Sequence, residues 1–235
     1  MDKRKREKGE TIVSNEIIHP TITIRKANPK EEQTRVSQSI VKLPFYKTHN
    51  YKIILPSEKE IDVKTDPNYY SNIQFIDSNP QIYREAIKIQ ELGRVKIIQS
   101  YNRLNEFHKL WRFDLFQNYS VVLTRYGTGG SYSAETGKII QRLDRLFGTE
   151  NDPAKTPIHE IVHIGLEKFI KKFGLRHTEK EGLVDGLCFS TLQDILPNYP
   201  VQNLVDKNIF QMVTLENAWQ KIPDVLTEYV KQYPR

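Results

Sequence analysis

The segment that most constrains the fold is TPIHEIVHIGLEKF, residues 156–169, because it places two histidines four positions apart in an apolar helical pattern. Thr156 can cap a helix and Pro157 suits a first helical turn. The sequence therefore predicts a helix over residues 157–173, which ends near Gly174. The apolar residues around the histidines are typical of a helix packed inside a domain.

The two histidines, His159 and His163, project from one face of this helix, since residues four apart lie about 40° from each other around the axis. Two imidazole nitrogens on one face can bind one metal ion. Glu160 lies roughly 100° from His159, where its carboxylate can hold a water and accept a proton. HEIVH thus has the form of the HExxH metalloprotease motif. The alternative interpretation is a buried helix with two hydrogen-bonded core histidines.

The chain after the motif offers candidates for the third protein ligand that a catalytic zinc site needs. A second helix is predicted to begin near His177, and it carries the segment EGLVD. Glu181 and Asp185 of this segment lie one turn apart, and His177 precedes Glu181 by one turn, so the three form one stripe. In a third interpretation, Glu181 and Asp185 are solvated helix charges.

With this pair of acids, residues 119–190 resemble the gluzincins, the thermolysin-like group of zinc peptidases. The resemblance implies a set of three ligands for one catalytic Zn²⁺ ion: His159, His163 and Glu181. It implies that Glu160 is the general base and that Asp185 accepts the outer N–H of His159. Neither the oxyanion-stabilising tyrosine and histidine of these enzymes nor the glycine-rich motif of related aminopeptidases is found in the sequence. Endopeptidase action is therefore favoured.

Two alternatives stay open. SprT-like proteases, which cut proteins crosslinked to DNA, take a third histidine at a comparable distance after the motif, and His177 would then replace Glu181 as the ligand. His177 can also cap the helix or stabilise an oxyanion. The other alternative is a binding protein in which zinc only holds two helices together, without catalysis.

A long helix is predicted over residues 80–116, because apolar residues recur there at steps of three and four. Pro80 suits its first turn, and Gly93 marks a break inside it. The expected buried face consists of these residues: Ile82, Ala86, Ile89, Gly93, Ile97, Tyr101, Leu104 and Phe107 or His108. In a zincin fold this would be the backing helix.

The predicted strands complete an α+β fold of the zincin type. Short strands are expected over residues 53–55 and 61–63, a longer one over 119–126, and a hairpin over 131–143 whose turn gives Gly137 a positive φ. In zincins an edge strand before the motif helix pairs with the substrate backbone. The resemblance assigns this role to three residues: Gly130, Ser131 and Tyr132. Further helices are predicted towards the C-terminus.

The N-terminal part is expected to be separate from this domain. Residues 1–45 are predicted to form a basic and polar appendage that can be flexible, with a short β-like piece, TITIRK, and residues 46–235 to form the zincin-like domain. The net charge of +6 owes much to the basic residues within 3–8. A nucleic-acid contact through that run is the alternative to a plain solvated terminus.

The predicted setting is cytoplasmic, with a protein or peptide as the substrate. The sequence has no apolar segment of a signal peptide and no membrane-spanning stretch, although non-classical export would leave no such mark. Cys188 is the single cysteine, which excludes an intramolecular disulfide and a zinc site built from thiolates.

Overall fold

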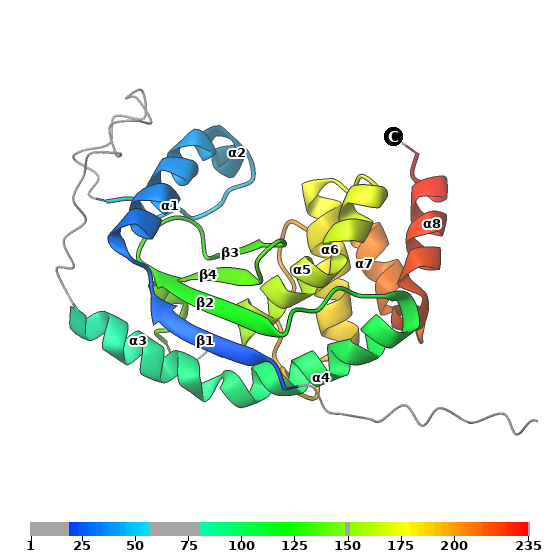
Figure 1. The fold of residues 1–235 in the computed structure, drawn as a ribbon. Helices are drawn as coiled ribbons and strands as arrows, with labels where there is room; N and C mark the ends of the chain where they lie inside the picture. Colours follow the sequence, from blue (N-terminus) through cyan, green and yellow to red (C-terminus); the bar gives the residue numbers. More distant parts are fainter. Residues whose placement is uncertain (1–18, 57–79, 149–150, 235) are drawn as a thin grey trace, which may run out of the picture.

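A four-stranded mixed sheet forms the centre of the computed structural model, which describes residues 19–56, 80–148 and 151–234 (Figure 1). In their order across the sheet the strands are β1 (Thr21–Lys26), β2 (Asn118–Thr124), β4 (Lys138–Arg142) and β3 (Gly130–Ser133). β1, β2 and β4 run parallel, and β3 is antiparallel to β4. The expected α+β class with a small mixed sheet and a hairpin at its edge is confirmed. Gly137 in the hairpin turn has the predicted positive φ, 65°.

The structure differs from the domain boundary expected at residue 45. β1 pairs with β2 along its whole length, from Thr21 opposite Asn118 to Lys26 opposite Leu123. The helices α1 (Pro29–Val41) and α2 (Leu43–Thr48) follow it. This segment belongs to the central sheet because its strand partner lies about a hundred positions later, a pairing that local patterns do not reveal.

Two sequence expectations lie outside the described residues: the basic run within 3–8 and the strand over 61–63. The strand expected over residues 53–55 is reduced to one bridge, between Ile54 and Gly127.

The predicted long helix is divided at Gly93 into α3 (Pro80–Leu92) and α4 (Arg94–Trp111), which together run along the sheet (Figure 1). A side chain at Gly93 would lie 2.7 Å from the backbone nitrogen of Ala154, which directly precedes the helix Lys155–Lys172. α4 ends earlier than predicted, because Arg112 takes a left-handed φ of 60° and the chain turns to bury Phe113 completely.

Most of the expected face of this helix pair is buried. The residues with at most 3% of their surface exposed are Ala86, Ile97, Tyr101, Leu104 and Phe107. His108 is exposed, so Phe107 is the residue that continues the face.

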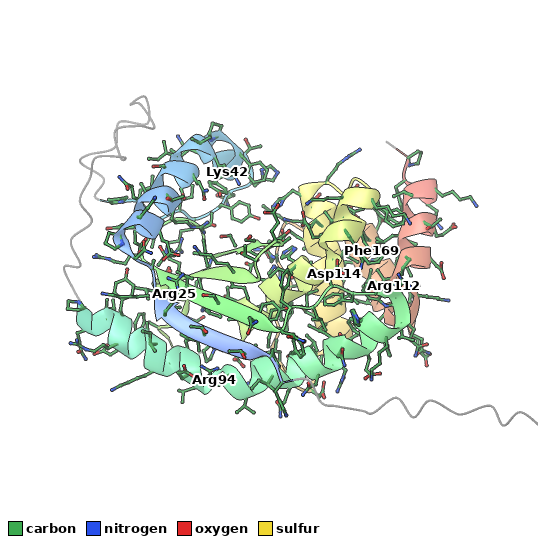
Figure 2. The ribbon with its side chains drawn as sticks, in the orientation of Figure 1. Arg25, Lys42, Arg94, Arg112, Asp114 and Phe169 are labelled. Atoms are coloured by element: carbon green, nitrogen blue, oxygen red, sulfur yellow. The ribbon has the colours of Figure 1, made fainter. Side chains whose placement is uncertain are left out.

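Helix α5 (Lys155–Lys172) carries the HEIVH motif through the core, where it contacts α4, β3 and β4. It begins before the predicted cap: Ala154 is the cap residue, and the Asp152 carboxylate accepts the Ala154 N–H at 3.0 Å. The helix ends before Gly174, which has the expected left-handed φ of 57°. Figure 2 shows the end of α4 beside α5, where the N–H of Asp114 donates to the Gly165 carbonyl at 3.2 Å.

The helices that follow α5 close the core on the far side from β1 (Figure 1). They are α6 (His177–Thr191), α7 (Lys207–Thr214), the 3₁₀ turn η4 (Ala218–Lys221) and α8 (Ile222–Gln232). α6 begins at the predicted residue. None of the helices in the described ranges is both long and apolar enough to cross a membrane.

The Gly165→Ala variant is expected to be less stable than the wild type by about 1–3 kcal/mol, since a methyl group there would collide with the buried Phe113 ring. Urea unfolding followed by circular dichroism measures this free energy. Replacing the ring by the smaller leucine side chain, in a Gly165→Ala/Phe113→Leu double variant, should cost less unfolding free energy than the sum of the two single variants. If the losses of the two single variants simply add up in the double variant, the two positions do not interact and the proposed collision is wrong.

Candidate metal centre

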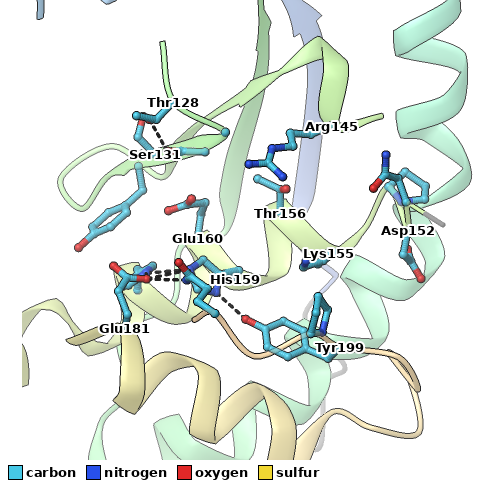
Figure 3. A pocket seen from close by; sticks show the side chains of 18 of the residues that line it. Thr128, Ser131, Arg145, Asp152, Lys155, Thr156, His159, Glu160, Glu181 and Tyr199 are labelled. Atoms are coloured by element: carbon cyan, nitrogen blue, oxygen red, sulfur yellow. Dashed lines mark hydrogen bonds and ion pairs between the residues drawn. The ribbon is translucent and has the colours of Figure 1, made fainter. Parts of the chain in front are cut away.

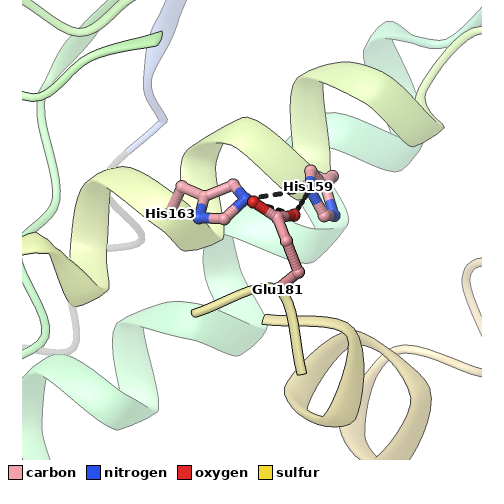
Figure 4. Close-up of side chains that lie close together, drawn as sticks. All are labelled: His159, His163 and Glu181. Carbon is pink, nitrogen blue, oxygen red and sulfur yellow. Dashed lines mark hydrogen bonds and ion pairs between the residues drawn. The ribbon is translucent and has the colours of Figure 1, made fainter. Parts of the chain in front are cut away.

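Three potential ligand atoms converge between α5 and α6. Nε2 of His159 and Nε2 of His163 lie 2.9 Å apart, and Oε2 of Glu181 lies 3.4 Å from the first and 3.2 Å from the second (Figure 4). In the described part of the chain, this is the group of histidine, cysteine and acidic side chains whose geometry can hold a metal ion. The structure therefore brings together the three residues that the gluzincin resemblance implied.

The spacing of these atoms fits one tetrahedral ion. Ligands at 2.0–2.1 Å from a tetrahedral zinc ion lie about 3.3 Å from one another. The observed separations of 2.9–3.4 Å fall around this value. Two imidazoles and one carboxylate are also the donor types of catalytic zinc sites.

The outer nitrogen of His159 meets a tyrosine that sequence reasoning missed. Nδ1 of His159 lies 2.6 Å from the hydroxyl oxygen of Tyr199 (Figure 3). That hydroxyl donates to Oδ1 of Asp185 at 2.7 Å. Asp185 itself is 3.4 Å from Nδ1. The expected partnership between Asp185 and His159 is thus present mainly through Tyr199. The hydroxyl can accept the Nδ1 proton and leave Nε2 free to bind a metal.

The loop after α6 supplies a second polar side chain. Gln202 donates from Nε2 to Oε2 of Glu181 at 2.8 Å, and its backbone N–H donates to Oδ2 of Asp185 at 2.7 Å. Both carboxylates of the EGLVD segment are therefore held in place by one residue. No periodic spacing relates Tyr199 or Gln202 to the motif, so their roles had no signal in the sequence.

His163 is held by packing. Its ring stacks on the ring of Tyr132 from β3, with centroids 5.1 Å apart and planes 10° apart. The Tyr132 hydroxyl donates to Glu167 at 2.8 Å, one turn further along α5. Nδ1 of His163 has no hydrogen-bond partner among the described side chains. The edge strand β3 and the motif helix α5 are therefore in direct contact at His163, a candidate metal ligand.

His177 lies beside the ligand group and not in it. Its Nδ1 is 3.6 Å from Oε1 of Glu181, the oxygen that faces away from the two motif histidines, and its Nε2 lies 2.5 Å from the hydroxyl of Tyr51. Tyr51 comes from the segment after α2. That segment is held by the bridge between Ile54 and Gly127, and Arg142 donates to the Lys52 carbonyl at 3.0 Å.

Glu160 is buried against the start of the edge strand. A side chain at Gly130 would collide with its carboxylate and push it out of its present position. Burial raises the pKa of Glu160 to about 7, although the nearby positive charges of His159, Lys180 and Arg35 oppose this. A carboxylate with a pKa near neutrality is suited to accept and return a proton.

The charges of the ligand group are strongly coupled. Burial lowers the pKa of His163 to about 4. Burial also acts to lower the pKa of His159, but hydrogen bonding to Asp185, Cys188 and Glu181, together with the charge of Glu160, outweighs it and raises this pKa well above its usual value. Burial acts to raise the pKa of Glu181, yet the two histidines hold it well below its usual range. The pocket is therefore built for one or more positive charges beside Glu181.

The edge strand is fixed by an arginine from α1. Arg35, 6% exposed, donates to the Ser131 hydroxyl at 2.8 Å and to the Thr128 hydroxyl at 2.9 Å. Gly130, Ser131 and Tyr132 all line the cavity that contains the ligand group. Within the described ranges no strand pairs with the outer side of β3. The three residues of the expected substrate strand are thus placed at the site.

Comparison with protein-family models, curated proteins and solved structures finds no match to this chain. A functional conclusion therefore depends on the geometry described above.

The Glu181→Gln variant is expected to lose at least tenfold in Zn²⁺ affinity, because it removes a charged ligand and keeps the side-chain shape. His177→Gln is expected to stay within about threefold of the wild type, since His177 lies outside the ligand group. Competition with a chromogenic chelator and elemental analysis measure affinity and stoichiometry. The reverse order of the two variants would establish His177 as the third ligand.

Proposed function

We propose that this protein is a zinc-dependent peptidase of the gluzincin type, in which His159, His163 and Glu181 hold the metal ion. The observation that carries the proposal is the convergence of their three ligand atoms within 3.4 Å, directly beside the buried carboxylate of Glu160. The order of long helix, edge hairpin, motif helix and glutamate helix supports a zincin-type domain.

Glu160 is the general base in this proposal. A bound zinc ion supplies Lewis acidity, which acidifies water and polarises a carbonyl group. The Glu160 carboxylate holds the attacking water by a hydrogen bond and takes its proton. After the attack it delivers this proton to the nitrogen of the leaving amine, which completes the proton balance of hydrolysis.

The edge strand β3 holds the substrate in this proposal. An extended peptide can add to the free side of β3 and use the backbone groups of Gly130, Ser131 and Tyr132. Because Gly130 contacts Glu160 and Tyr132 stacks on His163, a peptide on this strand passes over the ligand group. Protein and peptide segments in extended conformation are therefore the substrate class.

We assign the stabilisation of the oxyanion to Tyr51 and His177. They contact each other at 2.5 Å, and His177 lies next to Glu181. Burial raises the pKa of the Tyr51 hydroxyl, and the charge of Glu181 raises it further, so the hydroxyl stays protonated and can donate. In this proposal the two residues take the roles of the oxyanion-stabilising tyrosine and histidine of gluzincins. They lie far apart in the sequence, so no motif connects them.

The Glu160→Gln variant should keep its zinc and lose peptide cleavage by at least a thousandfold, because an amide cannot accept the proton of water. Cleavage of a fluorogenic peptide mixture, together with elemental analysis of the same preparation, tests both parts. Glu106→Gln, on the exposed face of α4, is the matched control and should cleave normally. Equal cleavage by wild type and Glu160→Gln would sink the proposal in favour of a non-catalytic zinc protein.

The Tyr51→Phe variant should lower kcat by about 10²-fold, since removal of one oxyanion donor typically costs 10²–10³ in kcat. KM and zinc stoichiometry should change little, because the ring still packs and the ligands are untouched. Tyr233→Phe, near the exposed C-terminal end, is the control. An unchanged kcat in Tyr51→Phe would remove Tyr51 from the mechanism and leave His177 as the donor.

A further inference from the structure

Two positive side chains, Arg145 and Lys155, lie near the start of the edge strand β3. Arg145 follows β4, and Lys155 begins α5, one helical turn before His159. Both line the cavity of the ligand group (Figure 3). Within the described ranges neither forms an ion pair, whereas the neighbouring acid Asp152 is already paired with Lys96 at 2.5 Å.

Gly129 and Gly130, at the start of the edge strand β3, lie between Arg145 and Glu160. A side chain at Gly129 would lie 2.8 Å from Nε of Arg145, and one at Gly130 would meet Glu160. Arg145 and Glu160 thus flank adjacent residues of the chain. Lys155 and His159 are about 6 Å apart along the helix axis. A peptide that lies on β3 with its scissile bond beside Glu160 would therefore pass the cations one or two residues away from that bond.

The two cations line the same cavity, and the hollow meant below is the part of it beside them. Lys155 is half-buried, and its Nζ lies 5.9 Å from the centroid of the Tyr199 ring. Burial lowers the pKa of Lys155, and the charge of Arg145 lowers it further, while the charge of Asp185 acts in the opposite direction. Two like charges held together in this way are unfavourable until an anion joins them.

We infer that this hollow binds a carboxylate of the substrate, so that the enzyme selects peptides with Asp or Glu one or two residues from the cleaved bond. Arg145 can receive the carboxylate with two parallel N–H donors, and Lys155 adds a second positive charge. The hollow lies at the N-terminal turn of α5, whose dipole also favours an anion. This inference rests on the proposed peptidase function and names its substrate class.

The test separates binding from cleavage. Fluorescein-labelled octapeptides rich in alanine carry one Asp, or one Asn, at each position in turn. Fluorescence anisotropy measures their binding to zinc-loaded Glu160→Gln, and mass spectrometry measures their cleavage by the wild type. At one position the Asp peptide should bind about tenfold more tightly than its Asn counterpart and be cleaved about tenfold faster. Both ratios should be smaller at high salt.

Arg145→Gln and Lys155→Gln should each lower this Asp/Asn ratio about threefold or more, and Arg145→Glu should bring it below one. Arg84→Gln and Lys88→Gln, on the exposed surface of α3, are the matched controls and should leave the ratio unchanged. Cleavage without an acidic preference, or a preference that survives Arg145→Glu, would overturn the inference alone. Binding with an acidic preference but no cleavage would overturn the peptidase function and support the carboxylate pocket.

Discussion

Two imidazole nitrogens and a carboxylate oxygen within 3.4 Å of one another, in a buried pocket, are the constraint on which the rest of this structure depends. The lone pairs of the two imidazoles repel each other unless a proton or a cation lies between them. Holding them together therefore requires a rigid surrounding. α5 and α6 provide it: Gly165 lets the Phe113 ring lie directly against α5, and Gly182 lets the chain before α7 approach α6 closely. Small residues on both helices thus fix the positions of the ligands.

The parts of the fold that could be predicted are those with a local cause. The helical repeat placed His159 and His163 on one face, and the one-turn spacing of Glu181 and Asp185 placed both acids on one stripe of the next helix. The resemblance to gluzincins, and not the spacing, assigned these acids to the two histidines. Gly93 and Gly137 marked a helix break and a turn, because each position leaves no room for a side chain or needs a positive φ. In all these cases the signal is local, a helical repeat or a glycine, even where the contacting residue is distant in the chain, as Ala154 is for Gly93.

The parts that could not be predicted depend on contacts between distant segments. β1 looked like an isolated strand in a tail, because its partner β2 lies about a hundred residues later. Tyr199 and Gln202 reach His159 and Asp185 from an irregular loop, where no period places side chains on a face. Their roles follow from the path of that loop around α6. Even the start of α5 depends on the Asp152 carboxylate, which competes successfully with the expected cap at Thr156.

The N-terminal segment, residues 19–56, contributes side chains that act on the charges of the candidate site. With a divalent cation at the ligand group, the charges of Glu181 and Asp185 would balance the ion, and the charge of Glu160 would depend on its cationic neighbours Lys180 and Arg35. Arg35 from α1 lies near enough to stabilise that charge, and it fixes the strand against which Glu160 packs. Tyr51, from the same part of the chain, reaches His177 on the other side of the site. A segment that resembles an appendage in sequence thus supplies one residue that fixes β3 beside Glu160 and one that contacts His177, so removing residues 19–56 would alter the candidate site as well as the sheet.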